Sequence, residues 1–86
     1  MHSVELFEQA VKVSDLLGFR LRHEWLDGTG GGACEINGQK WIFIDLALTS
    51  NEQFEQIAQA LLDDPGIYGV PLPHGLRQRL GIRKSA

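Results

Sequence analysis

The sequence predicts a small α+β domain with its elements in the order α-β-β-β-α. Apolar residues recur at helical spacing near the N-terminus and again after Thr49, and the stretch between these segments alternates with a period of two. That stretch also contains Asn37-Gly38, the strongest short signal for a β-hairpin. We expect a three-stranded, mainly antiparallel sheet with two helices on one face. Residues 1–66 are expected to form the core, and residues 67–86 an extended basic tail that packs on the core or on a partner.

The first helix is predicted over Val4–Leu17. Ser3 precedes it as a candidate N-cap, and Gly18 follows its last turn, where a left-handed glycine commonly ends a helix. Its core-facing stripe is expected to be Leu6, Ala10, Val13 and Leu17. The next segment, Phe19–Trp25, alternates apolar or aromatic residues with charged ones, which predicts a half-buried strand.

Asn37-Gly38 predicts a two-residue turn, because a type I′ turn requires positive φ at both central residues. The turn sets a register in which Glu35 faces Lys40, so that opposite charges meet across the strands. In this register one face of the hairpin carries Cys34, Ile36, Trp41 and Phe43. Two helices on the opposite side of the sheet cannot reach that face, so we expect another segment or another molecule to cover it.

The second helix is predicted to begin at a capping box formed by Thr49 and Glu52. Its apolar stripe consists of Phe54, Ile57, Ala58 and Leu61. Asp63-Asp64-Pro65-Gly66 is expected to stop this helix.

The tail begins with IYGVPLP, in which two prolines favour an extended chain. Leu76 and Leu80 lie one helical turn apart in a last short turn. Together with earlier apolar residues they form an apolar series with few polar interruptions before Arg77, namely Tyr68, Val70, Leu72, Leu76 and Leu80. We expect this series to cover the second face of the sheet, either in the same chain or in another copy.

The composition is ordinary for a globular protein, with 43% hydrophobic and 22% charged residues among 86. The single cysteine cannot form an internal disulfide, and no set of Cys and His has the spacing of a metal site. No apolar run approaches the roughly 18 residues of a membrane span. The N-terminal stretch is acidic and amphipathic, unlike a signal peptide. We therefore expect a cytoplasmic protein without a metal, a cofactor or a membrane contact.

Charge is unevenly distributed along the chain. All 11 acidic residues lie at or before Asp64, and the basic residues that follow are Arg77, Arg79, Arg83 and Lys84. A basic tail can contact nucleic acid, but four charges with no aromatic residue after Tyr68 give that reading little support. The simpler alternative is that the tail folds back on its own acidic body or on a second copy.

Asp27–Gly32 is rich in glycine, but it leads into a strand and lacks the Lys-Ser or Lys-Thr of a phosphate-binding loop. We interpret it as a connection that permits unusual dihedrals or close approach of another element. A catalytic alternative would use His23, Cys34 and Asp45 near this loop, with Cys34 as nucleophile and His23 as its base. A cysteine opposite Trp41 among apolar neighbours instead favours a small buried hydrophobe, and His23 lacks metal-ligand spacing.

The strand WIFID, followed by LTSNEQFEQIA, carries a family resemblance. Between Ala33 and Leu62 the chain resembles the strand-to-helix unit of small zincin metallopeptidases that cleave phage and mobile-element repressors. Phe54 matches a phenylalanine four residues before the HExxH motif of that family, but Ala58 and Leu62 replace its zinc-binding histidines and Gln59 its general base. The resemblance thus implies a peptidase-like scaffold without a peptidase site. The GG-x-C hairpin and the IY…P tail are also similar to small bacterial proteins that supply no function.

These observations together predict a non-catalytic module for protein interaction or self-association, because the apolar hairpin face has no assigned cover. The partner is expected to be a second copy, in a homodimer, or another protein, rather than nucleic acid. The alternative is a small-ligand-binding protein or an enzyme that uses His23, Cys34 and Asp45. A fast-alkylating Cys34 would favour that alternative.

Overall fold

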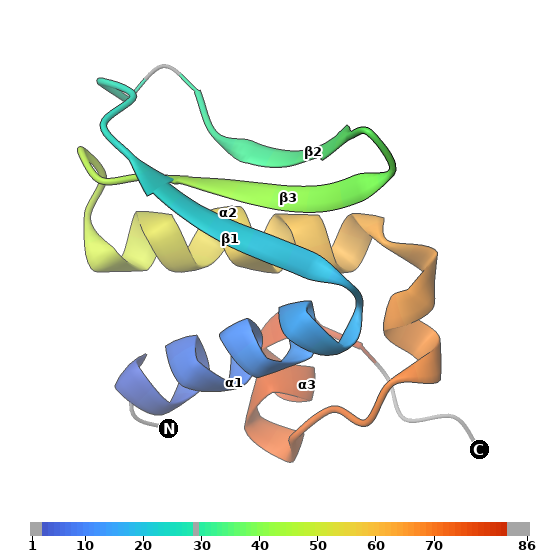
Figure 1. Ribbon diagram of the computed structural model, residues 1–86. Helices are drawn as coiled ribbons and strands as arrows, with labels where there is room; N and C mark the ends of the chain where they lie inside the picture. The colour runs from blue at the N-terminus through green and yellow to red at the C-terminus, as the bar shows by residue number, and fades with distance from the viewer. Residues whose placement is uncertain (1–2, 29, 83–86) are drawn as a thin grey trace.

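The computed structural model describes residues 3–28 and 30–82. The elements follow the predicted order, and two short helices are added after them (Figure 1). The elements are α1 (Ser3–Leu16), β1 (Phe19–Glu24), β2 (Gly32–Ile36), β3 (Gln39–Asp45), α2 (Ser50–Asp63), the 3₁₀ helix η1 (Pro65–Gly69) and α3 (His74–Leu80). The α+β class is confirmed, and the radius of gyration of 12.6 Å is close to the about 12 Å expected for a compact chain of this length. The basic residues Arg83 and Lys84 and the candidate cap on the side chain of Ser3 lie outside the described part.

β3 is the central strand of the sheet, which has the order β1-β3-β2. β2 pairs with β3 antiparallel, whereas β1 pairs with β3 parallel, so the sheet is mixed rather than mainly antiparallel. The reason is that the loop between β1 and β2 reverses the chain once and the hairpin turn reverses it again. β1 and β3 therefore run in the same direction, side by side (Figure 1).

The hairpin between β2 and β3 has the predicted register. The cross-strand pairs include Ile36 with Gln39, Glu35 with Lys40, Cys34 with Trp41 and Ala33 with Ile42. Asn37 and Gly38 both have left-handed backbones, with φ of 51° and 79°. These values are the ones that a type I′ turn requires, so the turn prediction is confirmed.

Both predicted helices are formed. The capping box of α2 is present, because the Glu52 N–H donates to the Thr49 hydroxyl and the Thr49 N–H donates to the Glu52 carboxylate. α1 ends before Gly18, whose φ of 90° is left-handed as predicted. Among the described residues, no helix is both long and apolar enough to cross a bilayer.

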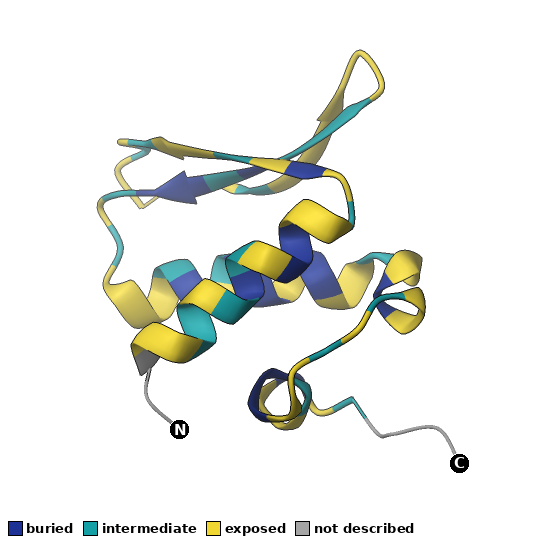
Figure 2. Cartoon of the chain, turned by 60° about the horizontal axis from the view of Figure 1, so that its bottom comes forward, coloured by how far each residue is buried: buried dark blue, intermediate teal, exposed yellow. Residues whose placement is uncertain are grey.

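The helices lie on one side of the sheet, as Figures 1 and 2 show. The inward side chains of β1 and β3, which include Phe19, Ile42 and Ile44, are buried there. They form a single core with one face of α1 and one face of α2. The buried helix residues are Ala10, Val13, Phe54, Ile57, Ala58, Ala60 and Leu61. The predicted core-facing stripes are therefore largely confirmed.

The C-terminal segment is not the predicted extended tail. Pro65 fits the first turn of η1, and Asp64 caps it by accepting a hydrogen bond from the Gly66 N–H. The chain is extended through the two later prolines, and α3 begins directly after Pro73. Gly81, with φ of 74°, ends α3.

This segment also does not cover the second face of its own sheet. α3 packs against α1 and buries Leu76 and Leu80, which lie one helical turn apart. η1 packs against α2 and buries Ile67. Tyr68 is 78% exposed. The remaining members of the predicted series are partly buried at the core, namely Val70 and Leu72. Arg79 of α3 forms an ion pair with Glu55 of α2. The described part of the basic tail therefore folds back on the acidic part of its own chain, which was the simpler of the two alternatives.

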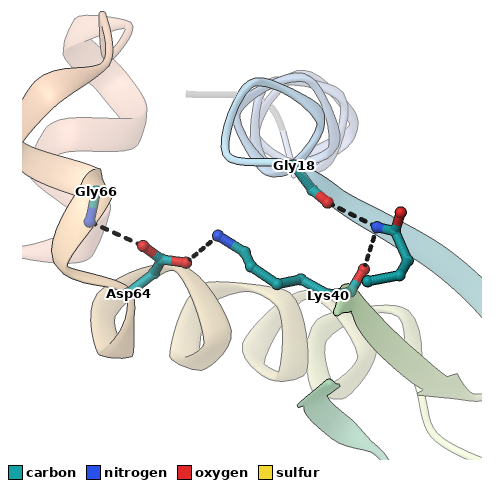
Figure 3. A network of polar contacts seen from close by, with 5 residues as sticks. Gly18, Lys40, Asp64 and Gly66 are labelled. Carbon is teal, nitrogen blue, oxygen red and sulfur yellow. Dashed lines mark hydrogen bonds and ion pairs between the residues drawn. The ribbon is translucent and has the colours of Figure 1, made fainter. Parts of the chain in front are cut away.

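A polar network joins the sheet to the end of α2 (Figure 3). Lys40 Nζ donates to Asp64 Oδ2 at 2.5 Å, and the Gly66 N–H donates to the other oxygen at 2.8 Å. Gln39 Nε2 donates to the Gly18 carbonyl at 2.9 Å. The hydrogen bond from Lys40 lowers the pKa of Asp64, burial opposes it, and the net pKa is below its ordinary value. The cation that neutralises Asp64 thus comes from β3.

Candidate interaction face

The face of the sheet opposite the helices, called the outer face, is built by alternate residues of the three strands. Since Ile42 and Ile44 point to the helices, their neighbours on β3 point outward, and the register assigns the residues of β1 and β2 that share this side. The outer face includes Arg20, Arg22, Cys34, Ile36, Trp41 and Phe43, and the same register places Glu24 and Gln39 on this side. It therefore contains the whole predicted interaction face together with two arginines from β1.

An aromatic pair lies along the middle of the outer face. The ring centroids of Trp41 and Phe43 are 6.1 Å apart and their planes differ by 21°. Arg20 lies opposite Trp41, and its guanidinium carbon is 5.9 Å from the Trp41 ring centroid, within cation–π range. Arg22 lies opposite Phe43, and its Nε donates to Glu24 at 2.5 Å. A basic row thus runs beside an aromatic row.

The outer face is open. No described segment crosses it in either view of the chain (Figures 1 and 2). On β2, Ile36 is 48% exposed and Cys34 is exposed as well, whereas Trp41 and Phe43 on the central strand are half-buried among their neighbours. The expectation of a buried Cys34 is therefore wrong, because the element that was to cover it lies in the helical layer instead.

His23 and Cys34 are not brought together. His23 lies opposite Ile44 and Cys34 opposite Trp41. Positions 41 and 44 point to opposite faces of β3, so the imidazole and the thiol lie on different sides of the sheet with the central strand between them. The predicted alternative of a thiol activated by this histidine is not formed.

Asp45 is fully buried at the end of β3. Its carboxylate accepts hydrogen bonds from the N–H groups of Leu26, Gly28 and Ala47 at 3.0, 2.6 and 2.9 Å. Burial raises the pKa of this carboxyl, but the three backbone donors outweigh burial, and the pKa lies below its ordinary value of 3.8. Both oxygens are engaged, so Asp45 fastens the loop after β1 to the end of β3.

Gln56 holds the glycine-rich loop from α2. Its Oε1 accepts from the Asp45 N–H at 3.0 Å, and its Nε2 donates to the Gly30 carbonyl at 3.2 Å. Gly31 has φ of 119°, and a Cβ there would overlap the Gln56 amide and lie 2.9 Å from the Phe43 carbonyl oxygen. The interpretation of this run as a place of close approach is confirmed, and β2 rather than a helix follows it.

A hollow of about 470 Å³ lies on the other side of the molecule, between the starts of α1 and α2. Its lining is mainly apolar and includes Leu6, Phe7 and Phe54. Arg79 also lines it and is paired with Glu55. The hollow contains none of the residues predicted for catalysis.

Within residues 3–28 and 30–82, no three His, Cys, Asp or Glu side chains are grouped so that they could hold a metal ion. Where the zincin motif would fall, Ala58 is buried in the core and Gln59 donates to Asp63 at 3.0 Å. Comparison of the chain with protein-family models, curated proteins and solved structures found no match. What the fold and the site define is a small compact α+β domain with one open, aromatic and basic sheet face.

Sequence reasoning missed Arg20 and Arg22 as members of this face. Their alternation with Phe19 and Leu21 correctly placed them on the solvent side of a strand. It did not show which strand β1 would join, because alternation specifies a face and not a neighbour. The parallel pairing with β3 brings them beside Trp41 and Phe43.

Proposed function

We propose that the chain is a non-catalytic protein-interaction module that binds its partner through the outer face. The observation that carries this proposal is the Trp41–Phe43 pair, half-buried among its strand neighbours and flanked by Arg20, with the exposed Cys34 and Ile36 beside it on β2. Tryptophan and arginine are among the residue types that contribute most to binding hot spots. An open apolar surface of this kind on a small domain is typical of an interaction site.

Charge indicates the chemistry of the partner. The outer face carries Arg20 and Arg22 with Glu24 as their acidic neighbour, whereas α1 and α2 carry most of the acidic residues of the chain. A protein that presents an apolar patch bordered by carboxylates complements this surface and is repelled by the helical side. We therefore expect an acidic, apolar docking surface on the partner.

The test compares two aromatic substitutions on opposite sides of the molecule. Trp41→Ser removes the centre of the outer face, and Tyr68→Ser removes a ring that is 78% exposed on η1. A partner captured from the source cells and then purified should bind wild type and Tyr68→Ser equally. Trp41→Ser should weaken binding at least about 30-fold, the loss expected for a hot spot. Equal binding by all three proteins, with the Trp41→Ser fold intact by circular dichroism, would contradict the proposal.

Single-stranded nucleic acid is the outcome that would replace a protein partner, since bases also stack on aromatic rings beside arginine. An oligonucleotide titration of a Trp25→Phe variant, followed by Trp41 fluorescence, separates the two. We expect no saturable quenching. Saturable quenching that disappears at high salt would assign the outer face to nucleic acid instead.

The catalytic alternative has its own measurement. Cys34 is exposed and His23 lies across the sheet from it. We expect Cys34 to react with iodoacetamide no faster than a small free thiol. A rate that is much faster, and that falls in a His23→Ala variant, would favour the enzyme.

A further inference from the structure

The sheet has two edges, and they differ in how well they are protected. β1 carries Arg20, Arg22, His23 and Glu24 along its six residues, whereas β2 carries Glu35 alone among five. Charged residues on an edge strand are a common means of preventing it from pairing with another chain. No described segment pairs with the free edge of β2. β2 is therefore the edge that is open to pairing.

The two-residue turn determines which backbone groups point away from the sheet. In a hairpin with such a turn, the residues that flank it, Ile36 and Gln39, form a hydrogen-bonded pair. Hydrogen-bonded and non-hydrogen-bonded pairs then alternate along the ladder. The backbone N–H and C=O groups of Cys34 and Ile36 thus face β3, and those of Ala33 and Glu35 face the free edge.

We propose that two copies of this chain pair antiparallel through their β2 edges, with Cys34 of each copy opposite Cys34 of the other. In this register Ala33 of one copy and Glu35 of the other exchange both of their backbone hydrogen bonds, and symmetry repeats the exchange. The two cysteines then form the closely spaced, non-hydrogen-bonded pair on the two-fold axis. The product is one continuous six-stranded sheet.

Charge and local geometry select this register. Centring the pair on Glu35 would place two carboxylates directly opposite each other, which is destabilising. Centring it on Ala33 would require Gly31, which packs against Gln56, to pair with Glu35. In the proposed register Glu35 faces Ala33 of the second copy and keeps Lys40 as its neighbour on the other side.

The helices permit this pairing. α2 lies under both β2 and β3, so its axis is about half a strand spacing inside β2. Two copies of α2 would then lie about 10 Å apart across the axis, a normal distance for packed helices.

The small area of a single outer face gives a reason for two copies to pair, and this step rests on the proposed function. Three strands about 4.8 Å apart and about 20 Å long project about 300 Å², well below the about 800 Å² that each side of a standard interface buries. Because the two outer faces lie on the same side of the joined sheet, pairing doubles the aromatic and basic surface. The second copy therefore gives the partner a site closer to standard size.

The first experiment is sedimentation of the full chain under reducing conditions, from about 10 μM to about 1 mM. Glu35→Pro removes the edge N–H, and Glu35→Thr removes the same carboxylate but keeps that N–H. We expect wild type and Glu35→Thr to dimerise and Glu35→Pro to lose at least about tenfold in dimer affinity. A monomeric wild type, or equal dimerisation by both variants with their folds intact, would overturn the proposal.

The second experiment tests the register with diamide, which takes up the two electrons and two protons released when two thiols form a disulfide. Cys34 should cross-link readily, because its partner lies at a Cα distance of about 4.5 Å. In a Cys34→Ser, Ile36→Cys chain the new thiols sit on the same face but about 13 Å apart along the strands, so little cross-linking is expected. Equal cross-linking would indicate face-to-face or random contact. Neither experiment uses a partner, so failure here leaves the Trp41→Ser test of the proposed function standing.

Discussion

At the scale of single residues, Asp45 is a buried carboxylate whose role is structural. In the sequence it was a candidate for the catalytic alternative, together with His23 and Cys34 near the glycine-rich loop. The structure instead surrounds it with backbone donors from residues 26, 28 and 47. A buried carboxylate whose two oxygens both accept from backbone donors is stabilised as the ion, and here those donors belong to the fold rather than to a substrate.

Asp45→Asn should therefore destabilise the protein. The amide nitrogen cannot accept a hydrogen bond, so at least one backbone N–H loses its acceptor and faces another donor. We expect the melting temperature at pH 7 to fall by at least about 5 °C. A melting temperature within 1 °C of wild type would contradict the role assigned to Asp45.

The same carboxylate should make stability depend on acid. Because the pKa of Asp45 is lower in the folded protein than its ordinary value of 3.8, the ionised group stabilises the fold above that value. This contribution is lost as the pH falls toward the folded-state pKa. Asp64, whose pKa is also lowered, adds to the same trend. We expect urea-unfolding free energies to decline below about pH 4, and less steeply in Asp45→Asn. Parallel declines in the two proteins would contradict this.

The sequence could not identify two of the three partners of Asp45, because they are backbone groups 17 and 19 residues away that the loop brings close. The same limit applies to His23 and Cys34, whose separation depends on the pairing of β1 with β3. Cross-strand neighbours within the hairpin, by contrast, follow from the turn alone, and Cys34 opposite Trp41 was correctly predicted.

At the scale of elements, the hairpin is the part most fully determined by local sequence. Gly38 has φ of 79° and no atom of the described residues within 4 Å of where a Cβ would lie. Gly38→Val should thus cost about 1–3 kcal/mol of unfolding free energy through backbone strain alone. Gly38→Asn should cost less, because asparagine tolerates a left-handed backbone. Equal unfolding free energies for wild type and Gly38→Val would show that the turn is not type I′.

The glycine-rich loop offers a matched pair of substitutions. Gly31 and Gly32 both have positive φ, 119° and 99°, but a Cβ at Gly31 meets Gln56 and the Phe43 carbonyl, whereas one at Gly32 meets nothing within 4 Å. Gly31→Ala should lower the melting temperature several degrees more than Gly32→Ala, since it also displaces the Gln56 bond to the loop. Equal melting temperatures for the two variants would show that Gly31 is not required for close packing of the loop against α2.

The elements that sequence reasoning misplaced are those whose position depends on distant contacts. The sequence predicted which side chains of β1 face the core, but not which strand β1 pairs with. Side chains alternate in the same way in parallel and in antiparallel strands, so alternation does not identify the neighbouring strand. In the segment after Pro65, most of the residues predicted to be buried are buried or partly buried, but its prolines led to the prediction of an extended chain. Pro71 and Pro73 instead lie between two short helices, η1 and α3, which pack against α2 and α1.

At the scale of the whole molecule, the C-terminal segment is part of the core. Ile67 and Leu76 are fully buried and Leu80 is 8% exposed. Three such side chains contribute about 5 kcal/mol or more, comparable to the entire stability of a small domain. A chain ending at Gly66 should show no cooperative thermal transition, whereas one ending at Ile82 should melt close to wild type. A Gly66-terminated chain that melts like the full protein would contradict this account.

The central position of β3 also governs the order in which contacts become available. β1 and β2 do not pair with each other. Phe19 of β1 pairs with Lys40 of β3, which is synthesised 21 residues later. As the chain leaves the ribosome, β1 has no strand to join until the hairpin has been completed. The hairpin closes through a two-residue turn at little entropic cost, whereas docking β1 closes a far longer loop. We therefore expect the β2–β3 hairpin to form first and β1, with α1 before it, to dock afterwards.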